Sequence, residues 1–400
     1  MLRLESVWRR CGTDECHYPA LTMAVPHPSL LHLVREGVFP DGVRVAMPIV
    51  DSAAEHGVAP LLDEAVRREG RDGDHEALVA LAMRSLETEA ATQATGDALL
   101  QLAGVAASLS IDVAVFKGLA IGSRWYPRPE LRPAADVDVF VNPAQSGRLG
   151  ELLDALAPDS APRDAVEAML TEGRVFEHPV NFAGVAVDVH VDPMNLVVAT
   201  RQNRLVWQRT VPLDLGQGLT VRTLDLEISI IQALLHLARD DFADLLHICD
   251  ISRMLEAGPD WTFVESFAAT EGWRDLVRFS LGAVCDILGR PSPLPTTLAP
   301  ANSAFARLFW PERIRLRGAD RVFQGAQRQS VASLLITGRR LEVAGALIRR
   351  MLPPRSVIDD RHAGARGPYP VALLHWRLAQ RAEIKHRRTA AREAVQHATR

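Results

Sequence analysis

Acidic residues stand at alternate positions in two short apolar segments, DVDVF and VDVHVD. In a β-strand, residues i and i+2 lie on the same face, and the residues between them lie on the other. Asp136 and Asp138 are therefore expected on one face of a strand whose valines point into a core. Asp188 and His190 are expected together on one face of a second strand, which Asp192 would end because a proline follows it.

Two neighbouring carboxylates repel each other and strands disfavour Asp, so a positive charge is expected beside Asp136 and Asp138. A divalent cation is the natural candidate, because Mg²⁺ accepts one or two carboxylates together with substrate phosphates. Asp188 would supply the third carboxylate of a two-metal phosphoryl-transfer site. His190 could be a base, a partner of a metal ligand or a structural histidine. A solvated strand edge with unlinked acids is the alternative interpretation of the acidic pair.

Lys117 and Gly118 follow the apolar segment IDVAVF, where a strand is expected to enter a turn. Glycine lets a phosphate approach the backbone, and lysine supplies charge to it. The chain has only two lysines, Lys117 and Lys385, against 43 arginines. A lysine in such a chain suggests a task that arginine cannot perform, such as placing a compact point charge on a phosphate. An ordinary tight turn accounts for a Lys-Gly pair equally well.

The remaining pattern predicts an α+β fold, in which a small mixed β-sheet core is embedded in mostly helical N- and C-terminal regions. Apolar spacing predicts helices over 29–34, 53–66, 76–102, 119–126 and 144–156, and again from residue 224 onward. Strands are expected at 111–116, 137–141, 175–182 and 185–191, the last two as a hairpin around residues 183–184. The predicted regions are 1–105 (helical), 106–220 (α/β core), 221–290 (helical, packed on the core) and 291–400 (basic and helical).

The composition is that of an ordinary globular protein, with 48% hydrophobic and 24% charged residues among 400. No apolar stretch approaches the roughly 18–20 residues that a membrane span needs. The N-terminal residues lack the apolar core of a signal peptide, so a cytoplasmic location is expected. The four cysteines do not form a disulfide framework. Cys11 and Cys16 could pair or share a metal with His17, although ordinary thiols are the simpler interpretation.

Charge is distributed unevenly along the chain. Residues 301–400 contain 20 Lys and Arg against 7 Asp and Glu, a balance of +13, whereas the first 300 residues carry −17 (25 minus 42). A basic C-terminal region, with a helix expected over 371–397, could contact an anionic partner such as RNA. It could equally dock on the acidic remainder of the same chain.

The segment FKGLAIGSRWYPRPELRPAADVDVFV resembles the uncharacterised nucleotidyltransferase family of the DNA polymerase β-like superfamily. The resemblance rests on Lys-Gly, Tyr-Pro-x-Pro, Arg-Pro and Asp-x-Asp in this segment, and on a later Asp-Val-His. It extends to His236 and Asp250 in the helical part, and it covers about residues 50–260. The usual Gly-Ser turn of the broad superfamily is replaced here by Lys117-Gly118.

The resemblance implies metal-dependent transfer of a nucleotidyl group from a nucleoside triphosphate to an acceptor hydroxyl, with release of pyrophosphate. It implies that Mg²⁺ or Mn²⁺ is bound by Asp136, Asp138 and Asp188. Triphosphate contacts are implied for Lys117, Gly118 and Arg132. Possible supporting residues are His190, His236 and Asp250, of which the last two could instead be a buried helix-packing pair.

The acceptor stays open at this point, and a small molecule, a peptide or protein and RNA are all compatible with the sequence. The main alternative is a nucleotide-binding regulatory or scaffold protein without turnover. A metal-dependent phosphohydrolase and a helical interaction protein are further alternatives.

Overall fold

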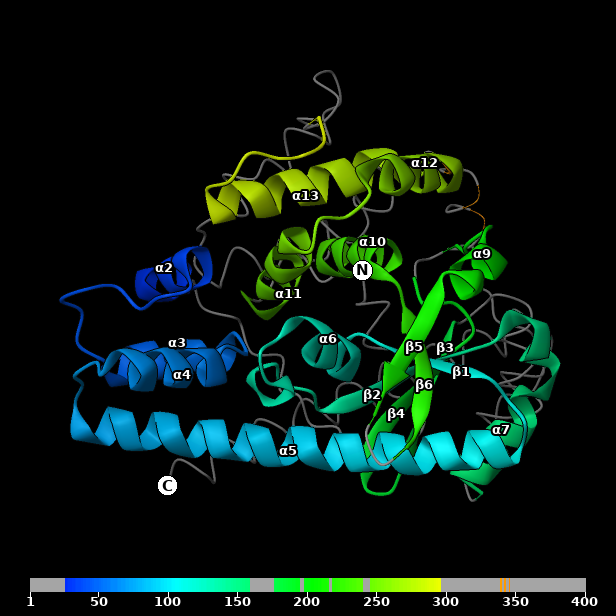
Figure 1. The fold of residues 1–400 in the computed structure, drawn as a ribbon, viewed down its shortest axis with the longest axis horizontal. Coiled ribbons are helices and arrows are strands. Elements are labelled where there is room, and N and C mark those ends of the chain that lie inside the picture. The colour runs from blue at the N-terminus through cyan, green and yellow to red at the C-terminus, as the bar shows by residue number, and fades with distance from the viewer. Residues whose placement is uncertain are drawn as a thin grey trace, which may run out of the picture.

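The computed structural model describes residues 26–158, 176–194, 198–215, 218–239 and 245–295, together with residues 339, 342 and 345. Within these residues helices surround a mixed sheet, as the predicted α+β class requires (Figure 1). The Cys11, Cys16 and His17 group lies outside the described residues, as does the basic helix expected over 371–397. None of the helices in the described part is long and apolar enough to cross a membrane.

Helices form the N-terminal part of the described chain. They are α2 (Pro28–Glu36), α3 (Met47–Glu55), α4 (Ala59–Glu69) and α5 (His75–Ser108). The segment 53–66, predicted as one helix, is divided between α3 and α4. Gly57 lies in the break at φ +69°, a backbone conformation that glycine adopts without steric cost. α5 runs almost the length of the molecule in Figure 1 and packs on α3, α4 and the sheet.

The middle of the chain alternates between strands and helices. Its first elements are β1 (Val113–Phe116), α6 (Gly118–Trp125), η1 (Pro129–Leu131), β2 (Asp136–Val141), η2 (Pro143–Arg148) and α7 (Leu149–Leu156). They are followed by β3 (Glu177–Phe182), β4 (Val185–His190), α9 (Asn203–Gln208), β5 (Thr210–Asp214) and β6 (Thr220–Leu224). The predicted strands at β1 to β4 are confirmed, whereas β5 and β6 were not predicted.

In the described residues the sheet has six strands in the order β3-β4-β2-β1-β6-β5. β2 lies near its centre, antiparallel to β1 and parallel to β4. The hairpin of β3 and β4 is antiparallel, as predicted, and its turn is at Ala183 and Gly184. This order places the two acidic strands next to each other.

The two faces of the sheet differ in what covers them. Val137, Val139 and Val141 of β2 are buried on one face, in a core shared with α5 and α7. Because side chains alternate along a strand, Asp136, Asp138 and Phe140 lie on the opposite face. Phe140 on that face, together with Phe116 of β1, packs into a core formed with helices that follow the sheet in sequence.

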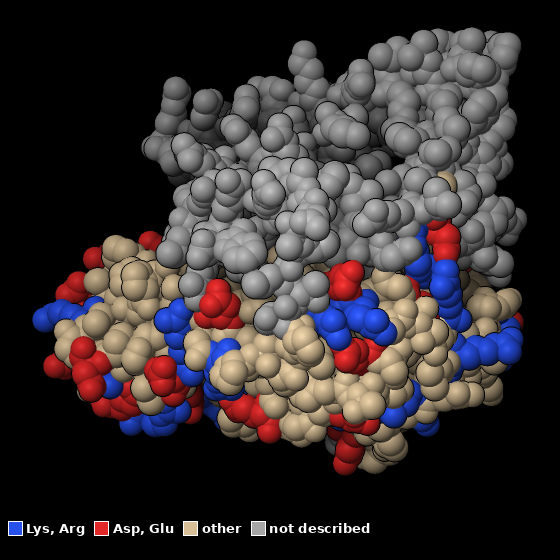
Figure 2. All heavy atoms as spheres, turned by 90° about the horizontal axis from the view of Figure 1, so that it is seen from above, with Lys and Arg blue, Asp and Glu red and all other residues tan. Residues whose placement is uncertain are grey.

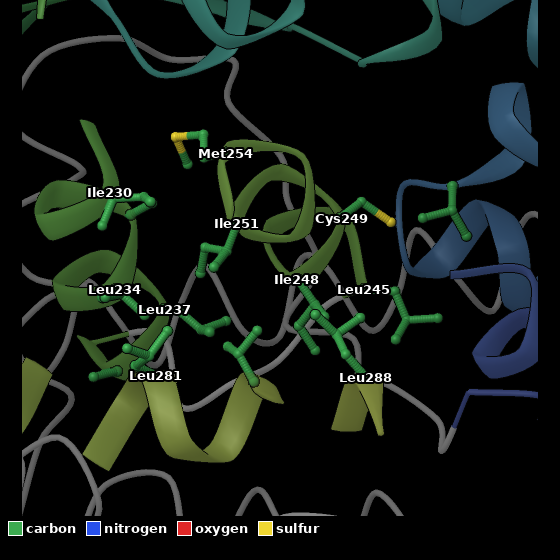
Figure 3. Close-up of a cluster of buried hydrophobic side chains, with 14 of the residues drawn as sticks. Ile230, Leu234, Leu237, Leu245, Ile248, Cys249, Ile251, Met254, Leu281 and Leu288 are labelled. Carbon is green, nitrogen blue, oxygen red and sulfur yellow. The ribbon is translucent and has the colours of Figure 1, made fainter. Parts of the chain in front are cut away.

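These later helices are α10 (Leu226–Arg239), α11 (Leu245–Glu256), α12 (Trp261–Glu271) and α13 (Arg274–Leu288). Figure 3 shows apolar side chains of α10, α11 and α13 pointing toward one another. The same core includes Phe116 and Phe140 of the sheet and buried residues of α2, α3 and α4. Helices before and after the sheet in sequence therefore share one core, and the predicted region boundaries stay a prediction.

Charged side chains of both signs are mixed over the described part of the face seen in Figure 2. No single-sign patch covers that part of the face. The predicted basic surface belongs to residues 301–400, of which the structure describes only residues 339, 342 and 345.

Candidate functional site

The site is assembled by the register of three adjacent strands. Asp138 on β2 lies opposite Asp188 on β4, and opposite Phe116 on β1. Two residues further along β2, Phe140 lies opposite His190. Lys117 directly follows Phe116, so the end of β1 brings the Lys117 side chain to Asp138 and Asp188.

Asp138 is the centre of this cluster. Its Oδ1 atom lies 2.5 Å from Lys117 Nζ and 2.8 Å from His190 Nε2, and only 3% of the residue is exposed. Burial would raise the pKa of the Asp138 carboxyl. The charge of Lys117 and the hydrogen bond with His190 outweigh burial and hold this pKa well below its usual range. Asp138 is therefore an ionised carboxylate whose charge is balanced within the protein.

Asp188 is in the opposite electrostatic situation. Burial, followed by the negative charges of Asp138 and Glu177, raises the pKa of the Asp188 carboxyl to about 6. Lys117 and His190 act against this shift but do not cancel it. Two adjacent carboxylates thus differ in proton affinity, which is the arrangement that lets one stay charged while the other exchanges a proton.

The donor atoms of Asp138, Asp188 and His190 lie within 4.8 Å of one another. Carboxylate oxygens suit Mg²⁺ and Mn²⁺, so the two aspartates fit a divalent cation of this type. His190 Nε2 is directed at Asp138, which fits a residue that orients a ligand. Asp136 is only half-buried at the start of β2 and lies outside this three-residue group. It shares a strand face with Asp138, as the sequence predicted.

The backbone at Lys117 is in a conformation that side chains rarely adopt, with φ 55° and ψ −132°. The strained residue stands between the last residue of β1 and the first of α6. Such strain costs of order 1–3 kcal/mol and persists where the surroundings enforce it. A Cβ at the next residue, Gly118, would lie 3.0 Å from Arg132 Nη1 and 3.2 Å from Ala134 Cβ. Close packing therefore accounts for the glycine at this turn.

Arg132 contacts Asp250 rather than Asp138 or Asp188, although its charge also acts on Asp136. Its guanidinium donates to Asp250 on α11, with 2.9 Å between Nη2 and Oδ2, and Tyr126 Oη donates to Oδ1 of the same carboxylate. His236 on α10 contacts His247 ring to ring at 4.7 Å. The structure thus brings Lys117 to the acidic strands and joins Arg132 to Asp250.

Glu177 on β3 is a residue of the cluster that the sequence interpretation missed. Its Oε2 lies 3.6 Å from His190 Nδ1, and the two residues are partners in the hairpin register. The signal was present, because a hairpin with its turn at residues 183–184 pairs position 177 with position 190. His190 is completely buried and its ring also contacts Phe116 edge-on. Its position between Glu177 and Asp138 is therefore well fixed.

The mixed sheet, with its acidic strands side by side and a helix beginning directly after β1, is consistent with the α+β core of nucleotidyltransferases. A family model described as "uncharacterised nucleotidyltransferase" matches residues 48–289, and the chain belongs to this family. The matched range contains every strand described above, the helices from α4 to α13 and all of α3 except its first residue. No curated protein matches the chain. The family resemblance predicted from the sequence is thereby confirmed.

Proposed function

We propose that the protein is a metal-dependent nucleotidyltransferase that moves a nucleoside monophosphate group from a nucleoside triphosphate to an acceptor hydroxyl and releases pyrophosphate. The observation that carries the proposal is the register pairing of Asp138 with Asp188 on adjacent strands of a nucleotidyltransferase family domain. Both carboxylates belong to one compact group of possible metal ligands.

Asp136, Asp138 and Asp188 would hold Mg²⁺ or Mn²⁺, because their oxygens are the donors that these cations prefer. When bound, the cation supplies charge that stabilises the transferring phosphate and eases deprotonation of the attacking hydroxyl. His190 would keep the Asp138 carboxylate oriented, since its buried ring bonds Oδ1 on one side and faces Glu177 on the other.

Asp188 is suited to receive the proton of the attacking hydroxyl. Before a cation binds, its pKa of about 6 lies nearer to neutral pH than that of an ordinary aspartate, and general bases work best near the working pH. Asp138 would stay ionised, because Lys117 and His190 lower its pKa before the cation binds and the charge of the cation would lower it afterwards. The attack would be in line at the α-phosphorus, so that pyrophosphate leaves on the opposite side.

Lys117 and Gly118 would meet the triphosphate at the turn after β1. Lys117 Nζ is a cationic group beside Asp138, and a compact ammonium is suited to a phosphate. Arg132 would act indirectly, because Asp250 engages its guanidinium. It would fix the loop that leads into Asp136. Asp250 and His236 would accordingly support the site through helix packing.

The proposal is tested by incubating the purified protein with each α-labelled nucleoside triphosphate and Mg²⁺ or Mn²⁺, with and without a cell extract that supplies acceptors. Label should move into a small-molecule, protein or RNA fraction with the wild type. It should not move with Asp138→Asn or Asp188→Asn. Asp97→Asn, which removes an exposed carboxylate from α5, is the matched control and should label normally.

Two other outcomes would count against the proposal. Equal labelling by the wild type and Asp188→Asn would remove the assigned role of the acidic strands. Metal-dependent nucleotide binding without transfer to any fraction would favour the nucleotide-binding regulatory or scaffold protein.

A further inference from the structure

Lys117 and Asp138 form an ion pair inside the candidate metal site. The Lys117 side chain is 13% exposed and that of Asp138 is 3% exposed, so water screens the pair only weakly. Breaking a buried ion pair by removing one partner is strongly destabilising. The lysine therefore stabilises the clustered carboxylates that the sequence left without an evident positive partner.

One oxygen of the Asp138 carboxylate is fully engaged. Asp138 Oδ1 is bonded both to Lys117 Nζ and to His190 Nε2, and a carboxylate oxygen has two lone pairs. A cation that binds Oδ1 must therefore displace one of these partners, and a cation that binds Oδ2 is repelled by an ammonium that stays beside the same carboxylate. His190 is buried between Phe116 and Glu177, whereas Lys117 reaches the oxygen through a long flexible chain. Lys117 is the partner that can leave.

The backbone gives independent support for a function of the Lys117 side chain. Glycine would adopt φ 55° at this position at lower cost than lysine. A lysine at a strained position, in a chain with only one other lysine, indicates that the ammonium itself is required.

We propose that Lys117 is an exchangeable counter-ion, which pairs with Asp138 before the substrate arrives and transfers its ammonium to the triphosphate when cation and nucleotide bind. This inference rests on the function proposed above. The cation takes over the neutralisation of Asp138, and the phosphates take over the neutralisation of Lys117. A cation without nucleotide would leave the ammonium beside it without an anionic partner. Metal and nucleotide should consequently bind with positive coupling.

The experiment measures the dissociation constant of Mn²⁺ by electron paramagnetic resonance, with and without a non-hydrolysable nucleoside triphosphate analogue. Lys117→Met removes the charge and keeps most of the side-chain length. We expect it to bind Mn²⁺ alone about 10-fold more tightly than the wild type, and to lose most of the coupling, which typically amounts to about 5- to 150-fold. Arg128→Met, which removes an exposed charge paired with Glu64, should behave as the wild type.

Thermal unfolding supplies a readout that is independent of nucleotide. In the presence of chelator, the melting temperature of Lys117→Met should be lower than that of the wild type. Saturating Mn²⁺ should increase the melting temperature of Lys117→Met by more degrees than it increases that of the wild type. If the wild type and Lys117→Met bound Mn²⁺ with equal affinity and showed equal coupling, the proposal that Lys117 is an exchangeable counter-ion would be wrong. The proposed function would survive that result if Asp138→Asn lost Mn²⁺ binding. If no variant and no wild-type sample bound Mn²⁺ even with the analogue, the proposed function would fail as well.

Discussion

Arg132 and Asp250 form a buried ion pair that joins the loop before β2 to helix α11. The distance between Arg132 Nη2 and Asp250 Oδ2 is 2.9 Å, and the two side chains are 8% and 0% exposed. Tyr126 donates to the same carboxylate at 2.8 Å, and Arg132 also donates to the carbonyl of Pro133 at 2.7 Å. Because β2 begins three residues after Pro133, this network fixes where the acidic strand starts.

Breaking this pair should lower the free energy of unfolding, in addition to any effect on nucleotide binding. Asp250→Asn leaves a buried guanidinium without its charge partner, and such a loss costs about 3–5 kcal/mol. Arg132→Lys should also destabilise, since an ammonium cannot reproduce the forked contact. Denaturant unfolding measures the change. Arg128→Lys, at an exposed pair with Glu64, is the control and should change stability by less than about 1 kcal/mol.

The same variants distinguish the two roles considered for Arg132. Unchanged stability of Arg132→Lys, combined with weaker nucleotide binding, would identify Arg132 as a direct phosphate contact. That result would contradict the supporting role assigned to it here.

The strain at Lys117 predicts an unusual order of stability for two small substitutions. Lys117→Gly and Lys117→Ala both remove the ammonium, so both lose the contact with Asp138. Only alanine retains a Cβ at φ 55°, and we expect it to be less stable than glycine by about 1 kcal/mol. Ser123 in α6 provides the control, because in a helix alanine should exceed glycine by about 1 kcal/mol. Urea unfolding of the four variants gives both differences, and the same sign at both positions would argue against strain at Lys117.

Asp188 predicts a pH dependence of stability in the presence of chelator. Its folded-state pKa of about 6 lies above the ordinary value of 3.8, so the folded state binds the proton more tightly than the unfolded state. The resulting stability is fully present below pH 3.8 and is lost as the pH rises through 6. The full shift corresponds to about 3 kcal/mol, taking about 1.36 kcal/mol per pH unit.

Asp188→Asn mimics the protonated carboxyl and should abolish this dependence. We expect the variant to be more stable than the wild type at pH 8, and the difference to shrink as the pH falls from 6 toward 4. Chemical unfolding at several pH values measures this difference. A wild type that is more stable than Asp188→Asn at pH 8 would show that the carboxylate is stabilised in its charged form.

The sequence was sufficient to predict the acidic face of the sheet, because strand alternation alone places Asp136 with Asp138 and Asp188 with His190. It did not predict β5, which contains Pro212. Proline is tolerated there because β5 is an edge strand of the sheet, and that edge position depends on the whole strand order. The division of segment 53–66 into α3 and α4 was missed for a local reason, since apolar spacing continues across Gly57.

Ionic partners that are distant in sequence could not be derived from spacing. The sequence required a positive charge near Asp138 and suggested a divalent cation, whereas the structure places Lys117 there, 21 positions earlier in the chain. Arg132 similarly pairs with Asp250 across 118 positions. The pairing of β1 with β2 brings Lys117 to Asp138, and the contact of α11 with the loop after η1 brings Asp250 to Arg132.

A substitution at Gly272 tests how strongly Arg339, which lies beyond the matched family range, contributes to stability through its contacts with the family domain. Gly272 ends α12 at φ 74°, and a Cβ there would lie 2.9 Å from Arg339 Cγ. Arg339 is 8% exposed, donates to the carbonyl of Ala199 at 2.8 Å and lies 3.6 Å from Glu271. Gly272→Ala must therefore displace Arg339 in addition to straining the backbone.

Gly289 is the matched control for this substitution. It ends α13 at φ 67°, and a Cβ at this position would meet no other atom within 4 Å. Gly289→Ala should lose about 1 kcal/mol from backbone strain alone. Gly272→Ala should lose about 1–3 kcal/mol more, as overpacking of a buried contact does. The comparison by urea unfolding isolates the contact with Arg339. Equal losses at the two glycines would mean that Arg339 moves aside without cost and does not anchor the later chain to α12.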